Sequence, residues 1–526
     1  MTGLPSDPAL MTAAEAGRAL AARALSPVDL VGAFLSRIER LDGLVSSYVS
    51  VLADEALSAA RDAEQEIAAG RCLGRLHGIP FAVKDNFMIA GAPARANSRI
   101  GPGEMPLATA RSAQRLIDAG AILLGKVNTY EYGTGDGTGL FDLPERPARN
   151  PWDLDRFPGG STTGGGAAVA AGLAPIVLGA DTGGSVRLPA AACGVSGLKP
   201  TYDLVSRAGV LPNCYSLDCI GPIASTAEDI GLVMPILAEA QLGDWQDAEP
   251  LAAFDWTKLR VAVVRRFHAS DVEADPEIVS GFEEAVRLLR GLGAKLVERE
   301  PAHGSSDFRY CSRIINAAEC YAIHEAEFLS RGADMGQALR WKLSVGAQIT
   351  AADYLRAQRW RRILAEEIDG LMVDCDVVLC CGATMTAPLL SEPEEIAGFT
   401  TRSAMSPFSL SGHPAISICN GFSRSGLPLN VQLAGRRFAD ARLVRVAAKL
   451  EHCFGLQSRR PRLDDASPGW SPPVGSGGSR DALDRSGVDE AKRSLQVTVQ
   501  QLPPRFPKAL EPFVGVKLER TPDASE

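Results

Sequence analysis

The sequence predicts an α/β fold in which helices surround a mostly buried mixed β-sheet, with an irregular tail at the C-terminal end. Two observations favour this class. Short apolar runs typical of buried strands alternate along the chain with longer segments whose apolar residues recur at helical spacing. Glycine is also abundant, with 52 residues among 526, which indicates many tight turns and close backbone approaches.

Residues 12–70 carry the pattern of helices. Ser26 and Pro27 form a good helix start, because a serine hydroxyl caps free N–H groups and proline fits the first helical position. Apolar residues then repeat at helical spacing, and Gly70 is suited to end a helix. We therefore expect a helical N-terminal part over about 12–70 and a catalytic core over about 71–456, together forming one domain over 1–456.

The core is predicted to alternate between strands and helices. Strands are expected at 78–87, 120–127, 173–180, 257–265, 295–299, 375–383, 414–421 and 427–435, with helices beginning at 111 and spanning 276–292 and 351–372. The adjacent Cys380 and Cys381 fall in an apolar run and are interpreted as strand core. Because the strands are apolar on both faces, the sheet is expected to be covered by helices on both sides.

The segment 457–526 differs from the rest of the chain. It is rich in proline, glycine, serine and charged residues, which disfavours long regular elements. A short helix at about 480–494 is the one element that its pattern allows. We interpret this segment as a poorly ordered tail, and a small partner-binding element is the alternative.

Composition excludes several classes of function. With 54 Lys and Arg against 63 Asp and Glu, the net charge is −9, which argues against binding nucleic acid mainly by charge. The uncharged stretch Phe157–Ala180 is broken by prolines and glycines, so it is interpreted as a buried loop, helix and strand and not as a membrane span. The eleven cysteines lack paired spacing, and no secretion signal is visible, so a reduced cytoplasmic protein is expected.

Three familiar motifs do not apply. Gly120–Val127 nearly matches a phosphate-binding loop, but Val127 replaces the required hydroxyl, so a core strand is expected. The glycine-rich run 133–139 lacks dinucleotide-binding spacing, and no GxSxG sequence is present. Six histidines without cluster spacing predict neither a metal site nor another cofactor, and His413 is interpreted as a turn residue.

Two serines that each follow a Gly-Gly pair are the candidates for chemistry. These are Ser161, in FPGGSTTGGG, and Ser185, in GADTGGSVR. A serine nucleophile needs a base, and a buried neutral lysine can supply one. Lys84, in the apolar run GIPFAVKDN, fits that role, because a charged amine is costly in such surroundings. The alternative is a surface lysine that closes a strand beside Asp85.

Six motifs in order make the chain similar to the amidase signature family of serine hydrolases. They are GIPFAVKDN, GAILLGKVNTYEY, RNPWDLDRFPGGSTTGGGAAVAAG, GADTGGSVRLPAAACGVSGLKPTYDLVSRAG, SLDCIGPIASTAED and LPLNVQLAGRRF, and the resemblance runs from about residue 12 to 455. It implies one large α/β domain around a twisted mixed sheet. It also implies a homodimer, a small-molecule amide substrate and no cofactor, and from the composition we expect neither nucleic acid nor membrane as partner.

The resemblance also implies roles for individual residues. Ser185 would be the nucleophile, Ser161 the bridging serine after a cis peptide bond from Gly160, and Lys84 the base. Backbone N–H groups of the loop before the nucleophile would form an oxyanion hole, which in this sequence means Thr182, Gly183, Gly184 and Ser185. Supporting positions are Thr162, Asp181 and Arg187, and the pocket-lining segment would include Tyr130, Tyr132 and Gly133.

For some of these positions the residues allow a second interpretation. Arg187 either braces the oxyanion loop or forms an ordinary ion pair with Asp181. Tyr130 and Tyr132 are either pocket walls or core aromatics.

The sequence departs from the family pattern at a few positions. Thr162 and Thr163 stand where a second serine and then glycine are usual, and the branched Thr163 would narrow or reorient the loop. The family's glutamine-using amidotransferase subunits usually carry an R-Q-P run, and this chain has Leu188 in place of that glutamine. Arg402 falls near the position where those subunits carry an acidic residue.

The expected function is hydrolysis of a carbon–nitrogen bond in a linear, non-peptide amide through an acyl-enzyme on Ser185. The alternative is an A-type amidotransferase subunit, the glutaminase partner in a tRNA-dependent amidotransferase. The departures at Leu188 and Arg402 count against a glutamine pocket. A third alternative is a scaffold without catalytic activity, which the intact set of Lys84, Ser161 and Ser185 disfavours.

Overall fold

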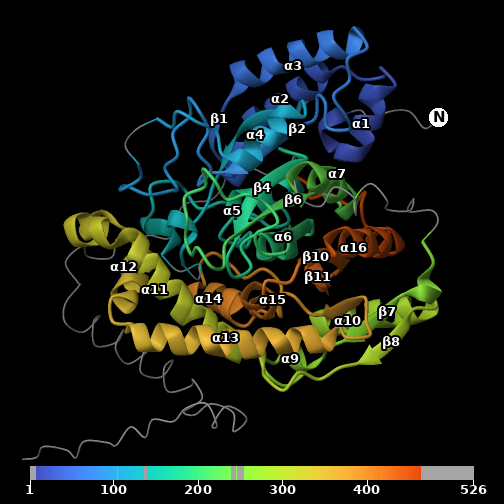
Figure 1. Ribbon diagram of the computed structural model, residues 1–526. Coiled ribbons are helices and arrows are strands. Elements are labelled where there is room, and N and C mark those ends of the chain that lie inside the picture. Colours follow the sequence, from blue (N-terminus) through green and yellow to red (C-terminus); the bar gives the residue numbers. More distant parts are fainter. Residues whose placement is uncertain are drawn as a thin grey trace, which may run out of the picture.

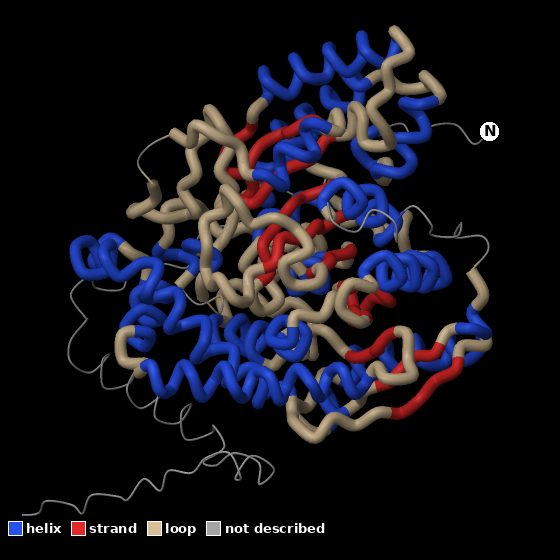
Figure 2. The backbone as a smooth tube through the Cα atoms, viewed as in Figure 1, coloured by secondary structure: helices blue, strands red, loops and turns tan. Residues whose placement is uncertain are grey.

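The computed structural model describes residues 7–102, 105–135, 137, 139–238, 245 and 254–463 of the chain. Strands run through the middle of the molecule, and helices lie around them (Figure 1, Figure 2). The predicted α/β class with a large mixed sheet is confirmed. The short helix expected at about 480–494 and the tail from residue 464 onward lie outside the described residues.

The helices and strands of the described residues have the following bounds. The α-helices are α1 (Ala13–Ala21), α2 (Pro27–Val45), α3 (Ala53–Ala68), α4 (Arg111–Asp118), α5 (Thr163–Ala170), α6 (Arg187–Cys193), α7 (Ala227–Leu237), α9 (Arg266–Ala269), α10 (Pro276–Gly291), α11 (Ser305–Arg331), α12 (Gln337–Gly346), α13 (Ala351–Leu371), α14 (Pro393–Thr401), α15 (Ser406–Ser411) and α16 (Asp440–Phe454). The strands are β1 (Tyr48–Val51), β2 (Pro80–Lys84), β3 (Ile122–Val127), β4 (Ile176–Asp181), β5 (Ser196–Lys199), β6 (Cys219–Ala224), β7 (Arg260–Val263), β8 (Lys295–Glu298), β9 (Val377–Cys380), β10 (Ala415–Phe422) and β11 (Pro428–Gly435).

Within the described residues the strands form one sheet of eleven, in the order β1-β3-β2-β4-β6-β5-β10-β11-β9-β7-β8. Strand β2 pairs in parallel with β3 and β4, and β7 pairs in parallel with β8 and β9. The remaining pairs, through β6, β5, β10 and β11 and at β1, are antiparallel. The sheet is therefore mixed, and short parallel groups flank an antiparallel centre.

The N-terminal helices lie at one end of the sheet beside β1, and β7 and β8 lie at the other (Figure 1). Helix α2 begins as expected, since the Ser26 hydroxyl accepts hydrogen bonds from the N–H groups of Val28 at 3.0 Å and Asp29 at 3.3 Å. The expectation of helix throughout 12–70 is wrong at one place, because Tyr48–Val51 forms β1. Its aromatic and branched residues suit a strand, and pairing with β3 decides their conformation.

The centre of the sheet is fully buried. Every residue of β2, β4 and β6 is buried, and so is every residue of α5, which packs against them. The stretch Phe157–Ala180 is thus a loop, a helix and a strand, as predicted. The described residues contain no helix both long and apolar enough to cross a bilayer.

A helical excursion between β8 and β9 was not predicted in full. The sequence pattern indicates α13, but α11 and α12 were not expected. These helices cover separate smaller cores, one involving α11, α13 and α15 and another between α11, α12 and the loop around residue 100. Polar residues of α11 and α12 contact loops near the site described next. These helices therefore help to build the surroundings of that site.

Candidate active site

Three strands bring the predicted catalytic residues to one edge of the sheet. Strand β2 ends at Lys84 and the parallel β4 ends at Asp181, while the antiparallel β6 begins at Cys219, opposite Asp181. The carboxyl ends of parallel neighbours and the start of an antiparallel one meet at the same edge. The loops after β2 and β4 and before β6 therefore converge there.

Lys84 is a buried amine bonded to a hydroxyl. Its side chain is 1% exposed, and its Nζ donates a hydrogen bond to Ser161 Oγ at 2.8 Å. Burial lowers the pKa of Lys84 to about 7, although the carboxylates of Asp218 and Asp181 act in the opposite direction. An amine with this pKa has a large uncharged fraction near neutral pH, so it can accept a proton.

The alternative of a surface lysine beside Asp85 is wrong. Asp85 is also buried, and its carboxylate forms an ion pair with the buried Lys126 at 2.7 Å. Lys126 is the lysine of the run Gly120–Val127, which forms β3 and the turn before it, as predicted. The Asp85 charge is therefore matched by another lysine, and Lys84 is left facing Ser161.

Ser161 follows a cis peptide bond from Gly160, as the resemblance implies. Its side chain is 2% exposed, and its carbonyl accepts a hydrogen bond from the N–H of Tyr130 at 3.1 Å. A methyl group on Gly160 would lie 2.3 Å from the Tyr130 ring, so only glycine fits. Tyr130 therefore fixes the segment that carries Ser161.

Ser185 lies beside this segment and is more accessible. Its carbonyl accepts a hydrogen bond from the N–H of Thr162 at 3.2 Å, which places the two serine loops side by side. Ser185 is partly exposed, and Gly183 is exposed with open space around it. The arrangement is a buried amine, a buried hydroxyl and a hydroxyl-bearing loop at the surface.

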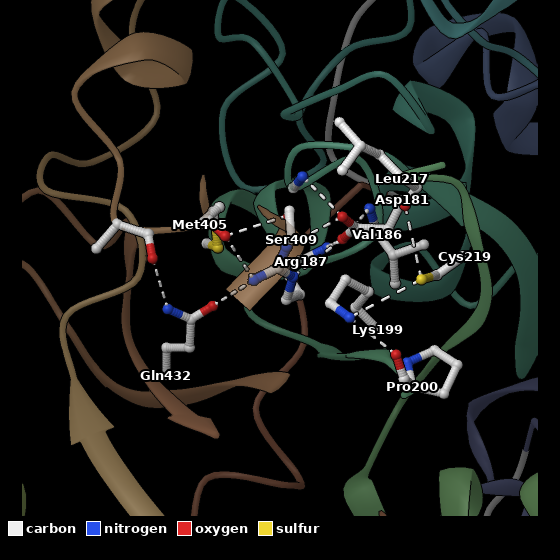
Figure 3. Close-up of polar contacts among 12 residues, drawn as sticks. Asp181, Val186, Arg187, Lys199, Pro200, Leu217, Cys219, Met405, Ser409 and Gln432 are labelled. Carbon is white, nitrogen blue, oxygen red and sulfur yellow. Dashed lines mark hydrogen bonds and ion pairs between the residues drawn. The ribbon is translucent and has the colours of Figure 1, made fainter. Parts of the chain in front are cut away.

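Asp181 binds the backbone of the loop that carries Ser185, and Figure 3 shows it beside Val186 and Arg187. Its carboxylate accepts hydrogen bonds from the N–H groups of Gly184 at 2.7 Å and Val186 at 3.2 Å. The Gly184 N–H is thus committed to Asp181. This leaves the N–H groups of Thr182, Gly183 and Ser185 for an oxyanion hole.

Arg187 forms a two-bond ion pair with Asp181 inside the protein (Figure 3). Nε and Nη2 each lie 3.0 Å from a carboxylate oxygen, and both side chains have no exposed surface. Burial alone would raise the pKa of Asp181, but the guanidinium of Arg187 lowers it. The two interpretations of Arg187 therefore coincide, because the ion pair is also the brace of the loop.

Groups from distant parts of the chain complete the shell around Arg187 (Figure 3). Gln432 Oε1 accepts from Nη1 at 2.8 Å, Ser409 Oγ accepts from Nη2 at 2.6 Å and the Met405 carbonyl accepts from Nη1 at 3.2 Å. No local sequence pattern predicted these residues as part of the site. Only the fold brings β11 and α15 to the nucleophile loop.

Asp218 is a further residue that the sequence analysis missed. Its Oδ1 accepts a hydrogen bond from Thr182 Oγ1 at 2.6 Å, and its carboxylate is an electrostatic partner of Lys84. The motif SLDCIGP contains it, so a signal was available. However, the motif by itself gives no contact with Lys84 or Thr182.

The three residues of the expected pocket segment differ in position. Tyr130 and Tyr132 are 2% and 6% exposed, and their rings pack against Phe157 and His324, which makes them core aromatics. Gly133 lies beside the candidate catalytic residues, since a methyl group built on it would be 3.4 Å from both Lys84 Nζ and Ser161 Oγ. A side chain at residue 133 would therefore contact both Lys84 and Ser161.

The two threonines that follow Ser161 are both buried. Thr163 is the first residue of α5 and packs inside, so its branched side chain is accommodated. Thr162 Oγ1 has no hydrogen-bond partner among the described residues, and a methyl group on Gly179 would lie 2.9 Å from it. Thr162 thus contributes its backbone N–H and its packing to the site.

Other residues singled out from the sequence lie elsewhere. Leu188 is buried in α6, and Arg402, at the end of α14, forms an ion pair with Glu395 at 3.2 Å. His413 is buried and lies 2.9 Å from Ser411 Oγ and 3.1 Å from Asp369. No cluster of three or more metal-ligating side chains occurs in the described part of the chain.

A groove of about 950 Å³ lies on the molecule, but none of the candidate catalytic residues lines it. Its walls come from α4 and from the segment Met105–Thr109, which carries the exposed Leu107.

Comparisons with known proteins agree with this architecture. The family described as Amidase matches residues 29–444. Over 493 aligned residues the chain is 35% identical to the A subunit of the glutamyl-tRNA(Gln) amidotransferase of Chloroflexus aurantiacus, covering 86% of this chain and 98% of that protein.

Solved structures share the fold as well. A chain from a complex described as vestigial and as revealing the origins of an s-triazine catabolic enzyme superposes with a TM-score of 0.76 and 29% identity, covering 86% of this chain and all of that one. The native peptide amidase of Stenotrophomonas maltophilia superposes with a TM-score of 0.71 and 27% identity, covering 86% of this chain and 99% of that one.

Proposed function

The chain belongs to the amidase signature family, and from that premise we propose that it hydrolyses a carbon–nitrogen amide bond through an acyl-enzyme on Ser185. The observation that carries the proposal is the hydrogen bond of 2.8 Å from the buried Lys84 amine to Ser161 Oγ, beside the loop of Ser185. An amine that burial brings to a pKa of about 7 is a base suited to neutral pH.

The first half of the reaction makes the acyl-enzyme. Neutral Lys84 takes a proton from Ser161, which takes one from Ser185, and Ser185 Oγ forms a bond to the substrate carbonyl carbon. The carbonyl oxygen becomes an oxyanion, for which the N–H groups of Gly183 and Ser185, with that of Thr182, are the proposed donors. One such donor contributes about 3–4 kcal/mol to transition-state stability.

The leaving amine then needs a proton, because an amide nitrogen leaves poorly as an anion. The lysine ammonium returns its proton through Ser161 to that nitrogen as the carbon–nitrogen bond breaks. Water next attacks the ester on Ser185 and gives a proton through the same relay. The acid is then released with Ser185 reprotonated, so the cycle consumes one water and one amide.

A fluorophosphonate probe tests the proposal without knowledge of the substrate. We expect the wild-type protein to be labelled on Ser185 and Ser185→Ala to remain unlabelled, while Ser270→Ala, a change at an exposed serine, labels normally. Screening aliphatic, aryl, amino-acid and carbamate amides then identifies the substrate class. A folded wild-type protein that neither reacts with the probe nor cleaves any amide would refute the proposal.

A second candidate function is that of an A-type amidotransferase subunit. The observation that favours it is the identity of 35% to the A subunit of a glutamyl-tRNA(Gln) amidotransferase over 98% of that protein's length, and names of this kind recur among the relatives. Leu188 and Arg402, the two departures in the glutamine-pocket motifs, count against it. Both candidates share the acyl-enzyme on Ser185 and differ in the leaving group, which is either an amine released to solvent or the ammonia of glutamine passed to another subunit.

Glutaminase activity and companion subunits distinguish the two candidates. If the amidotransferase role is correct, the chain co-purifies with other subunits and hydrolyses glutamine faster in their presence. If it is an independent amidase, the purified chain, alone or as the homodimer that we propose from its resemblance, cleaves a small amide at full rate and ignores glutamine.

A further inference from the structure

Asp218 holds the segment that leads into β6. Asp218 is 7% exposed. Its Oδ2 accepts hydrogen bonds from the N–H groups of Asn213 at 2.9 Å and Cys214 at 3.0 Å. Its other oxygen, Oδ1, accepts a hydrogen bond from Thr182 Oγ1 at 2.6 Å. One oxygen thus organises Asp218's own loop and the other reaches the loop that carries the nucleophile.

The Thr182 hydroxyl is fixed from two sides. It donates to Asp218 and accepts from Asn213 Nδ2 at 3.2 Å. A hydroxyl that both donates and accepts in a buried site has a single orientation. Since Thr182 begins the proposed oxyanion loop, these contacts hold that loop at its first residue, while Asp181 holds it at Gly184.

The negative charge of Asp218 is also stabilised differently from that of Asp181. Asp181 is neutralised by Arg187 at 3.0 Å. In the described part of the molecule, Asp218 accepts hydrogen bonds only from neutral groups. It is the first electrostatic partner that favours the ammonium form of Lys84, ahead of Asp181.

Several other titratable groups face Asp218. They are Lys84 from β2, Lys342 from α12, Cys214 from the preceding loop, Cys219 from β6 and Asp181 from the end of β4. Burial raises the pKa of Asp218, whereas Thr182 and the two N–H groups lower it. The charge of Lys342 also lowers it, and Lys342 donates a hydrogen bond to Asn213 Oδ1 at 2.6 Å.

We propose that Asp218 is a positioning residue with two separable effects on the proposed reaction. Its hydrogen bond to Thr182 keeps the oxyanion loop in place, which sets the maximal rate. Its negative charge sets the pH range over which Lys84 can accept a proton. This inference rests on the proposed function, since it concerns the same serine and lysine.

The test is the rate of fluorophosphonate labelling of Ser185 as a function of pH. For the wild-type protein we expect a rate that rises to a plateau with a midpoint near pH 7, as Lys84 loses its proton. In Asp218→Asn the ammonium loses its main partner, so the midpoint falls by about one pH unit. One unit below the wild-type midpoint, the variant then labels about fivefold faster relative to its own plateau.

The plateau reports the second effect. We expect it to fall about tenfold in Asp218→Asn and in Thr182→Val, and to return in Thr182→Ser, which keeps the hydroxyl. Thr182→Val keeps the charge of Asp218, so its midpoint does not fall. If Asp218→Asn does not fold, Asp218→Glu replaces it and must keep the wild-type midpoint while its plateau drops.

Asp440→Asn is the matched control. Asp440 is another buried carboxylate that accepts from a threonine hydroxyl at 2.6 Å and from a backbone N–H at 2.8 Å, both of Thr201. It is not a partner of Lys84, so its variant should keep the wild-type midpoint even if its unfolding temperature drops.

The outcomes distinguish a failure of the role proposed for Asp218 from a failure of the proposed function. A wild-type protein that labels on Ser185, with Asp218→Asn unchanged in midpoint and plateau, overturns the role of Asp218 and leaves the proposed function standing. Equal midpoint shifts in Asp218→Asn and Asp440→Asn also overturn it. A wild-type protein that never labels refutes the proposed function, and this inference falls with it.

Discussion

Two regions of the molecule bury carboxylates, and Asp181 in one region is satisfied in the opposite way from Asp229 and Glu451 in the other. At the catalytic edge, Asp181 meets the guanidinium of Arg187 in a two-bond ion pair. At the junction of α1, α7 and α16, Asp229 and Glu451 are also buried but accept hydrogen bonds from neutral groups. Asp229 accepts from the N–H of Ala14 at 2.8 Å and Glu451 from the N–H of Ala227 at 2.8 Å.

The two regions differ accordingly in charge state. Burial raises the pKa of Asp229 and of Glu451 to about 7, because hydrogen bonds from neutral groups offset only part of the loss of water. Asp181 stays ionised because Arg187 lowers its pKa. Matched charge therefore gives the nucleophile loop a brace that does not change near neutral pH, whereas the junction changes its protonation there.

Lys84, also at the catalytic edge, is hydrogen-bonded to a neutral hydroxyl, and replacing it gives the largest expected effect. Lys84→Met should lower amide hydrolysis and labelling of Ser185 by about a thousandfold or more, because the relay loses its base. Its stability should not fall, since a buried amine without an ion pair costs desolvation. Labelling rates and urea unfolding measure the two effects.

Lys126→Met sharpens this prediction. Lys126 is as buried as Lys84, but it pairs with Asp85 at 2.7 Å, so its loss leaves a buried carboxylate alone. We expect a clear loss of stability in this variant and none in Lys84→Met. Equal losses in both would contradict the distinction between a base and a structural lysine.

Breaking the Asp181–Arg187 pair is expected to have the next largest effect. Arg187→Leu leaves Asp181 buried without its cation, which should cost about 3–5 kcal/mol of unfolding free energy. Combining it with Asp181→Asn should recover part of the loss, because the uncompensated charge is gone. Chemical denaturation of the single and double variants measures the coupling, and strict additivity would mean that the pair does not act as a unit.

The junction is expected to make the stability of the protein depend on pH. A carboxyl whose pKa is raised in the folded state stabilises the protein at acidic pH, and that stability is lost as pH rises toward the folded pKa of about 7. Asp229→Asn should therefore reduce the loss of stability between pH 5 and pH 8 by up to about 2 kcal/mol. Thermal unfolding at both pH values, with the exposed Asp62→Asn as control, checks it; identical pH slopes would rule the effect out.

The smallest effect is expected at Thr162. Its hydroxyl is buried without a partner in the described structure, so Thr162→Val keeps the shape and removes an unsatisfied polar group. We expect a change in stability within about 1 kcal/mol, toward higher stability, and activity within about twofold. A large loss of labelling would instead give the Thr162 hydroxyl a role in the site.

Local sequence patterns predicted much of the fold. The Ser26–Pro27 start, the buried strand ending at Lys84 and the helix over 351–372 follow from capping, apolar runs and periodicity, which are properties of neighbouring residues. The strand Tyr48–Val51 was missed because its conformation depends on pairing with β3. The long helix Ser305–Arg331 was also missed. It packs on α12, α13 and α15 through a face of mixed polar and apolar residues.

For the site, the sequence alone determined the residue types and their order: a lysine in an apolar run and two serines after glycine pairs, in motifs of one family. It could not decide that Lys84 faces Ser161 while Lys126 takes Asp85, or that Gly184 N–H is committed to Asp181. It also could not place Asp218 beside Thr182. Apart from the local bond between Gly184 and Asp181, these contacts join residues 36 to 77 positions apart. Burial and electrostatic pairing are set by whatever the sheet brings together, so only the tertiary structure decided them.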